Sequence, residues 1–149
     1  MKKELKIKVG ENDIKKSDIA RVNVLLKQLN PEAGKLSYET VKEVMSRGIV
    51  LTLRDASKKH KLIGMATLLP VRKLFVYCGT IEDVVIDESY RGKGLGKGIA
   101  KNLIKRSKVM GMKFVDLTSN PDRVVANNLY QSVGFVKRET NVYRLNHPE

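Results

Sequence analysis

Residues 88–105 read ESYRGKGLGKGIAKNLIK, with four glycines at alternate positions from Gly92 to Gly98. Before them lies the mostly apolar segment TIEDVVID (80–87), and after them comes a segment with the spacing of an amphipathic helix. Each glycine inside a regular element costs about 0.5–1 kcal/mol relative to alanine, so the cluster needs a reason. A helix N-terminus offers free N–H groups, and glycines allow a ligand to come close to them. The stretch therefore predicts a strand, a phosphate-binding loop and a helix.

Two familiar phosphate-binding motifs do not match this loop. A P-loop requires G-x-x-x-x-G-K-[ST], and no Ser or Thr follows a Gly-Lys pair here. The dinucleotide fingerprint requires G-x-G-x-x-G, but the sixth position is Lys97 when counted from Gly92 and Ile99 when counted from Gly94. A glycine-rich turn without a ligand is the alternative, and the neighbouring cations Arg91, Lys93 and Lys97 argue against it.

The pattern that does fit is R/Q-x-x-G-x-G/A, met by Arg91, Gly94 and Gly96. About forty residues later comes NNLYQSVGF (127–135), which contains L-Y-x-x-x-G-F. The two motifs and the order of expected elements resemble the GNAT N-acetyltransferase superfamily over nearly the whole chain. The segment IEDVVIDESYRGKGLGK also resembles glucosamine-6-phosphate N-acetyltransferases, whereas the later helix is more similar to bacterial GNAT proteins for which the resemblance names no acceptor. The acceptor stays open at this point.

The resemblance implies that the chain transfers an acetyl group from acetyl-CoA to a primary amine by direct attack. The amine could belong to a small molecule, such as an amino sugar phosphate, or to a protein. The loop that would hold the cofactor pyrophosphate comprises Arg91, Gly92, Lys93, Gly94, Leu95, Gly96 and Lys97. Its backbone N–H groups from Gly92 to Lys97 would make the contacts.

The resemblance also assigns roles outside the loop. The backbone of Val84, Val85 and Ile86 would pair with the pantetheine arm, and an N–H near Val84 would polarise the thioester carbonyl. Tyr130 would protonate the departing thiolate, and Asn127 would be a further cofactor contact. Spacing alone favours a packing role for Tyr130, and the resemblance reverses that preference. Many relatives carry Asn seven residues before this Tyr, where this chain has Arg123.

Two carboxylates, Glu82 and Asp83, lie within the apolar strand segment. Buried charges are costly, so either they pair with cations or one of them is a general base with a raised pKa. Successive strand residues point to opposite faces, so one of the two is expected to face away from the site. We favour Glu82 as the base.

The periodicities predict one domain over residues 1–149 with an α/β (α+β) fold. Strands are expected at 5–9, 49–55, 62–71 (interrupted by Pro70), 76–87, 113–119, 135–139 and 141–145. Helices are expected from a Ser17 cap to about Asn30, over 38–47 after a Ser37 cap, from the glycine loop to Met110, and over 122–132. This order indicates a GNAT-like, mixed but mostly antiparallel sheet of about six to seven strands, flanked by about four helices.

The composition of the chain limits the cellular location and the partners that are expected. The chain has 149 residues, a net charge of +13, one cysteine and no apolar run of membrane-spanning length, which favours a cytoplasmic location without membrane contact. The charge leaves a nucleic-acid-binding module as an alternative, but few aromatic residues are present to stack bases, so nucleic acid is not the expected partner. A CoA-binding sensor without catalysis is the third class. No Cys, His and Asp spacing indicates a metal site, and a homodimer is compatible with the resemblance.

Overall fold

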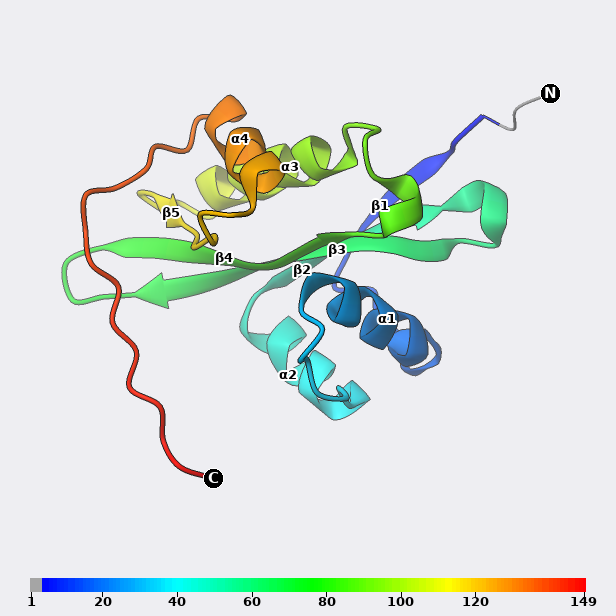
Figure 1. The fold of residues 1–149 in the computed structure, drawn as a ribbon, viewed down its shortest axis with the longest axis horizontal. Coiled ribbons are helices and arrows are strands. Elements are labelled where there is room, and N and C mark those ends of the chain that lie inside the picture. The colour runs from blue at the N-terminus through cyan, green and yellow to red at the C-terminus, as the bar shows by residue number, and fades with distance from the viewer. Residues whose placement is uncertain (1–3) are drawn as a thin grey trace.

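The computed structural model describes residues 4–149 as a sheet between two layers of helices (Figure 1). In chain order the elements are β1 Ile7–Glu11, η1 Lys16–Asp18, α1 Ile19–Leu29, α2 Tyr38–Arg47, β2 Ile49–Asp55, η2 Ala56–Lys58, β3 Lys61–Arg72, β4 Tyr77–Ile86, η3 Glu88–Tyr90, α3 Leu95–Val109, β5 Val115–Asp116 and α4 Val124–Ser132. Helices α1 and α2 cover one face of the sheet, and α3 and α4 cover the other.

The sheet has the strand order β1-β2-β3-β4-β5, so every strand neighbours the next one in sequence. The first four strands pair antiparallel, whereas β5 lies parallel to β4 after the crossover through α3. Only Gly79 and Thr80 of β4 pair with β5. Beyond Thr80 the two strands are no longer paired, and β4 is hydrogen-bonded to β3 alone.

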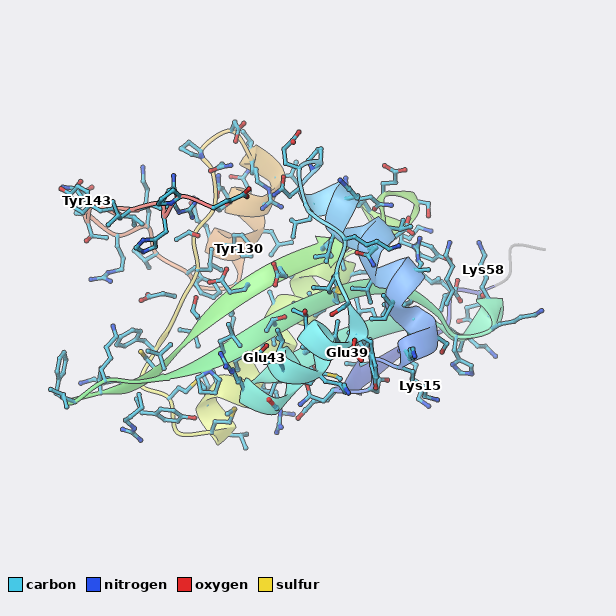
Figure 2. All side chains as sticks on the ribbon, turned by 90° about the horizontal axis from the view of Figure 1, so that it is seen from below. Lys15, Glu39, Glu43, Lys58, Tyr130 and Tyr143 are labelled. Carbon is cyan, nitrogen blue, oxygen red and sulfur yellow. The ribbon has the colours of Figure 1, made fainter. Side chains whose placement is uncertain are left out.

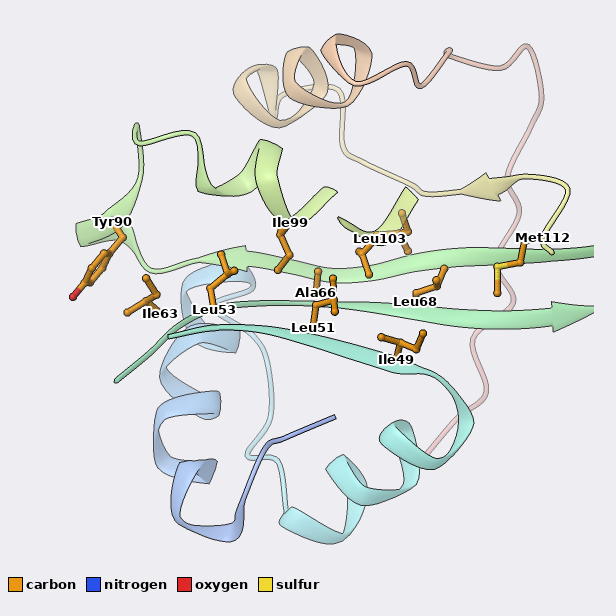
Figure 3. Packing of buried hydrophobic residues seen from close by; sticks show 11 residues of the cluster. Ile49, Leu51, Leu53, Ile63, Ala66, Leu68, Tyr90, Ile99, Leu103 and Met112 are labelled. Carbon is orange, nitrogen blue, oxygen red and sulfur yellow. The ribbon is translucent and has the colours of Figure 1, made fainter. Parts of the chain in front are cut away.

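Alternating side chains divide the core between the two faces. On β2, Ile49, Leu51 and Leu53 join the cluster that packs against Ile99 and Leu103 of α3 (Figure 3). The intervening Val50 joins a second cluster with residues of α1 and α2. Apolar residues on both faces explain why this segment reads as a nearly continuous hydrophobic run.

Of the two helix caps expected from the sequence, the structure confirms the one at Ser37 and corrects the one at Ser17. The Ser37 side chain accepts a hydrogen bond from Thr40 N at 3.2 Å, which confirms the expected cap of α2. The cap expected at Ser17 is wrong: Ser17 lies inside η1, and Asp18 precedes α1. Asp18 makes no cap bond because its carboxylate pairs with Arg54 of β2.

Pro70 does not interrupt β3, contrary to the expected break. It pairs in register with Gly79, whose own N–H donates to Phe114 O at 3.1 Å on the other side of β4. Beyond Leu68 the strand β3 has lost β2 as a neighbour, so a residue without an N–H is tolerated there.

The sheet has five strands, fewer than the six to seven expected, because the two expected C-terminal strands do not form. Residues 135–149 contain no strand and run away from α4 toward the far side of the sheet (Figure 1). A hairpin needs a further partner for stability, and β5 offers only two paired residues. Strand periodicity alone could not reveal that this partner is missing. Within residues 4–149, no helix is long and apolar enough to cross a bilayer.

Candidate functional site

The glycine loop connects η3 to α3 and presents a row of free backbone donors. Gly92 and Gly94 both have φ of +75°, a conformation that side chains rarely adopt, and Gly94 is the N-cap of α3. Within the described residues, no N–H from Gly92 to Lys97 donates to another group of the chain, and the first that does is Gly98 N, to Gly94 O at 3.1 Å. A Cβ added at Gly92 or Gly94 would meet only open space. The loop therefore exposes six consecutive donors at the positive end of a 15-residue helix.

Gly96 has a different function in the same segment. A Cβ at this position would lie 2.9 Å from Leu129 Cδ1, so the glycine allows α4 to pack closely on α3. That contact places the helix carrying Tyr130 beside the loop.

The cations of the loop are partly engaged within the chain. Arg91 donates from Nε to Ile86 O at 3.0 Å, which ties the loop back to the end of β4. The Lys93 ammonium lies 5.4 Å from the centre of the Tyr90 ring. Lys97 is exposed on the first turn of α3.

A cavity of about 510 Å³ opens where β4 and β5 diverge. It is lined by the end of α1 and the following turn, the middle of β4, the segment after β5, and α4. The lining residues are Leu29, Asn30, Pro31, Ile81, Glu82, Asp83, Val84, Leu117, Thr118, Asn120, Arg123 and Tyr130. Figure 2 shows Tyr130 on α4, beside the sheet. The sequence had identified Glu82, Val84 and Tyr130 as site residues, and the structure brings these three to one cavity.

Glu82 and Asp83 both line this cavity, which corrects the expectation that one of them must face away. The register of β4 against β3 shifts between Met65 and Thr67, and Asp83 has φ of +54°. Such a bulge adds a residue to one strand and breaks the alternation of side chains. The period-two argument failed because nothing in the sequence marks a bulge at Asp83.

The titrating groups of the cavity differ in environment. Desolvation of the carboxyl group, followed by the neighbouring charge of Glu82, raises the pKa of Asp83, although the residue as a whole is exposed. Glu82 accepts a hydrogen bond from Thr80 Oγ1 at 2.8 Å. Burial also raises the pKa of Tyr130, with Arg123 acting in the opposite direction. Tyr130 is 8% exposed and packs edge-on against Phe135, so its phenol is protonated at neutral pH.

The remaining predicted cofactor residues differ in burial and in hydrogen bonding. Val85 is buried in the cluster of α1 and α2, so only its backbone is available to a ligand. Val84 and Ile86 are half-buried on the opposite side, next to α3. Asn127 donates from its amide to Asn120 O at 2.9 Å, which holds the segment that follows β5. A direct contact between Asn127 and the cofactor stays a prediction.

Sequence reasoning missed the cavity residues that carry no motif. Asn30 and Pro31 lie just after α1, where no motif marks a site. Asn120 precedes α4 and also lines the cavity. Among residues 4–149, no group of three or more His, Cys, Asp or Glu is arranged to hold a metal ion.

Comparison with known proteins agrees with this geometry. The family model described as acetyltransferase (GNAT) family matches residues 24–135. Glucosamine 6-phosphate N-acetyltransferase 1 of Oryza sativa subsp. japonica is 28% identical over 127 residues, 79% of this chain and 74% of that protein. A crystal structure of a Trypanosoma brucei acetyltransferase has a TM-score of 0.77 at 27% identity and covers 95% of this chain and 100% of that one. An aminoglycoside N-acetyltransferase, AAC(6′)-Iy in complex with CoA, has a TM-score of 0.78 at 13% identity and covers 99% of each chain.

Proposed function

Because this chain belongs to the acetyltransferase (GNAT) family, we propose that it acetylates the amine of a small amino sugar phosphate. The reaction class, N-acetyl transfer from acetyl-CoA, follows from the family and its relatives. The acceptor, the direct attack and the roles of single residues are parts of the proposal.

The row of six free N–H groups from Gly92 to Lys97 is the observation that carries the proposal. These donors, with the open space above Gly92 and Gly94, suit a pyrophosphate, which carries several acceptor oxygens and negative charge. The part of β4 that is paired with β3 but not with β5, from Ile81 to Ile86, then offers a strand edge to the amide groups of the pantetheine arm. The loop and this strand edge together therefore offer partners for two parts of CoA, the pyrophosphate and the pantetheine arm.

The side chains of the cavity supply the proton transfers. Acetyl-CoA supplies a thioester carbonyl that an uncharged amine can attack. One carboxylate of the Glu82–Asp83 pair takes a proton from the acceptor ammonium, which frees the nitrogen lone pair for that attack. As the new C–N bond forms and the C–S bond breaks, Tyr130 donates its phenolic proton to the leaving sulfur. The acetylated nitrogen then loses its remaining extra proton, which restores the phenol of Tyr130, and the carboxylate releases the first proton to solvent, so that no acyl-enzyme is formed.

The charges around the cavity support an acceptor that carries both an amine and a phosphate. Glu82 and Asp83 place negative charge on β4, where an ammonium would be held. Arg123, which precedes α4, adds a cation to the lining of the same cavity, and a guanidinium is well suited to a phosphate. The Oryza sativa relative is named for such an acceptor. The volume of about 510 Å³ lies in the range of small-molecule sites.

A steady-state assay of thiol release with acetyl-CoA tests the proposal. Glucosamine 6-phosphate is expected to be acetylated with a higher kcat/KM than glucosamine, because only the former can use Arg123. Arg123→Gln is expected to remove most of this preference while acetylation of glucosamine changes little. Equal rates for both sugars in the wild type, or a preference that survives in Arg123→Gln, would rule out the phosphate-specific acceptor. The N-acetylation of a peptide amine instead would reassign the acceptor to a protein.

A further inference from the structure

A buried hydrogen bond anchors the residue immediately before the glycine loop. Tyr90 is 4% exposed, and its hydroxyl donates to Asp55 Oδ2 at 2.8 Å. Figure 3 shows its ring beside Ile63, at the end of the core cluster, with the hydroxyl pointing away from that cluster. Asp55 is 1% exposed at the end of β2, so the bond joins two parts of the chain that lie 35 positions apart.

The Asp55 carboxylate divides its two oxygens between separate tasks. Oδ1 accepts from Ser57 N at 2.9 Å and from Ser57 Oγ at 2.6 Å, which fixes the carboxylate in the local turn. Oδ2 is left for Tyr90. The hydrogen bonds, led by those of Ser57, lower the pKa of Asp55, and burial raises the pKa of Tyr90. Both shifts favour a charged acceptor facing a protonated donor at neutral pH.

A second turn of the same kind holds residues 87–89, immediately before Tyr90. Asp87 accepts from Ser89 N at 2.9 Å and from Ser89 Oγ at 2.6 Å, and its other oxygen pairs with Arg21 of α1. Asp87 is 3% exposed. Residues 87–90 are thus fixed from two sides before the chain enters the glycine segment.

We propose that Asp55, acting through the Tyr90 hydroxyl, is a positioning residue for the cofactor loop. The loop contains two glycines at positive φ and makes no backbone bond of its own between Gly92 and Lys97, so its position depends on its ends. Its far end is fixed by the helix α3, and its near end by Tyr90. Lys93, inside the loop, lies over the Tyr90 ring, so the orientation of that ring also affects a cation of the loop.

Neither the known motifs nor the packing requires this hydroxyl. A phenylalanine ring would fill the same space beside Ile63, and Tyr90, which donates to Asp55, is not part of the R/Q-x-x-G-x-G/A motif. The sequence contains the pattern Asp-x-Ser at 55–57 and again at 87–89, which indicates two similar turns but does not indicate that one of them reaches the loop.

The inference rests on the proposed role of the loop in holding the pyrophosphate, so the experiment compares two acetyl donors. S-acetyl-pantetheine has the thioester and the arm but lacks the pyrophosphate, the ribose and the adenine of acetyl-CoA. In Tyr90→Phe and Asp55→Asn, we expect KM for acetyl-CoA to rise roughly two- to tenfold, the effect of one hydrogen bond, with kcat near wild type. The kcat/KM for S-acetyl-pantetheine should stay unchanged. The double variant should be no worse than either single variant, because both changes remove the same bond.

Tyr77→Phe is the matched control, since Tyr77 lies at the opposite end of β4 and has no hydroxyl partner among the described residues. It should leave both donors unaffected. Equal losses for the two donors in Tyr90→Phe would show a purely structural role and would overturn the proposal. If Tyr90→Phe does not fold, Asp55→Asn, which keeps the side-chain shape, decides in the same way. If the wild type itself does not distinguish the two donors, the loop does not hold the pyrophosphate, and the proposed function of the loop fails together with the positioning role.

Discussion

Gly94 and Gly98 lie four positions apart in the same segment, and replacement of each by alanine should have opposite effects on stability. Gly94 has φ of +75°, so Gly94→Ala forces a side chain into the left-handed region at a cost of about 1–2 kcal/mol. Gly98 lies inside α3, where a Cβ would meet nothing within 4 Å. Gly98→Ala should therefore stabilise the helix by about 0.8–1 kcal/mol.

These free energies translate into measurable shifts of the melting temperature. For a chain of this size, 1 kcal/mol corresponds to roughly 2–4 °C. Without ligand, Gly94→Ala should melt about 2–8 °C below wild type, and Gly98→Ala should melt about 2–4 °C above it. Neither value depends on any assumption about function.

Acetyl-CoA adds the functional part of the test. At 100 times its Kd, a ligand of the folded state stabilises by about 2.7 kcal/mol, or roughly 5–11 °C here. Gly94→Ala should lose most of this gain, because its methyl group occupies the space above the free N–H groups. Gly98→Ala should keep it, because the Gly98 N–H is already bonded to Gly94 O.

Differential scanning calorimetry of the three proteins, with and without acetyl-CoA, measures all of these shifts. Dephosphorylated fragments such as pantetheine provide a ligand control that should not distinguish the variants. A full acetyl-CoA shift in Gly94→Ala would refute the assignment of the loop. A lost shift in both variants would indicate a general distortion of α3 instead.

Three further outcomes are expected. Tyr130→Phe should lower kcat by about 10²–10⁴-fold, because it removes the proposed proton donor. The melting temperature should change little, since the ring and its contact with Phe135 remain. A normal kcat together with a lowered melting temperature would make Tyr130 a packing residue. The kcat/KM for the acceptor should rise with pH as the base loses its proton, and Glu82→Gln tells which carboxylate is the base. If Asp83 is the base, the variant should show the rise at lower pH, because Glu82 contributes to the raised pKa of Asp83; if Glu82 is the base, the rise should disappear. An unchanged pH profile would exclude both assignments. The thermal shift produced by acetyl-CoA should shrink between low salt and about 1 M salt, where the Debye length falls to about 3 Å, and a salt-independent shift would contradict phosphate binding at exposed donors.

Sequence patterns predicted those parts of the fold that depend on local chemistry. The Ser37 cap, the long strands of the meander and the loop-to-helix transition at Gly94 are each set by a few neighbouring residues. The family motifs added the loop and Tyr130: Tyr130 lines the cavity, and the loop begins the helix α3 on which α4 packs.

The parts that escaped prediction depend on partners distant in the chain. Asp83 reaches the cavity only because β4 bulges against β3, and period-two reasoning cannot detect an inserted residue. The segment 135–149 has strand-like alternation, but alternation does not show whether a neighbouring strand is present. The bond between Tyr90 and Asp55 links two positions whose separation in sequence gives no signal.

The divergence of β4 and β5 has a consequence for the order in which the protein opens. The four antiparallel strands form a continuous meander of sequence neighbours, whereas the crossover to β5 returns to the sheet through two residue pairs only. Amide hydrogens of β5 and α4 are therefore expected to exchange with solvent through a local opening that leaves the meander intact. A cofactor bound along the free edge of β4 would bridge the two halves and slow that exchange. Acetyl-CoA in that position would supply hydrogen bonds that β5 does not make to β4, so β5 and α4 are expected to exchange most slowly in the presence of acetyl-CoA.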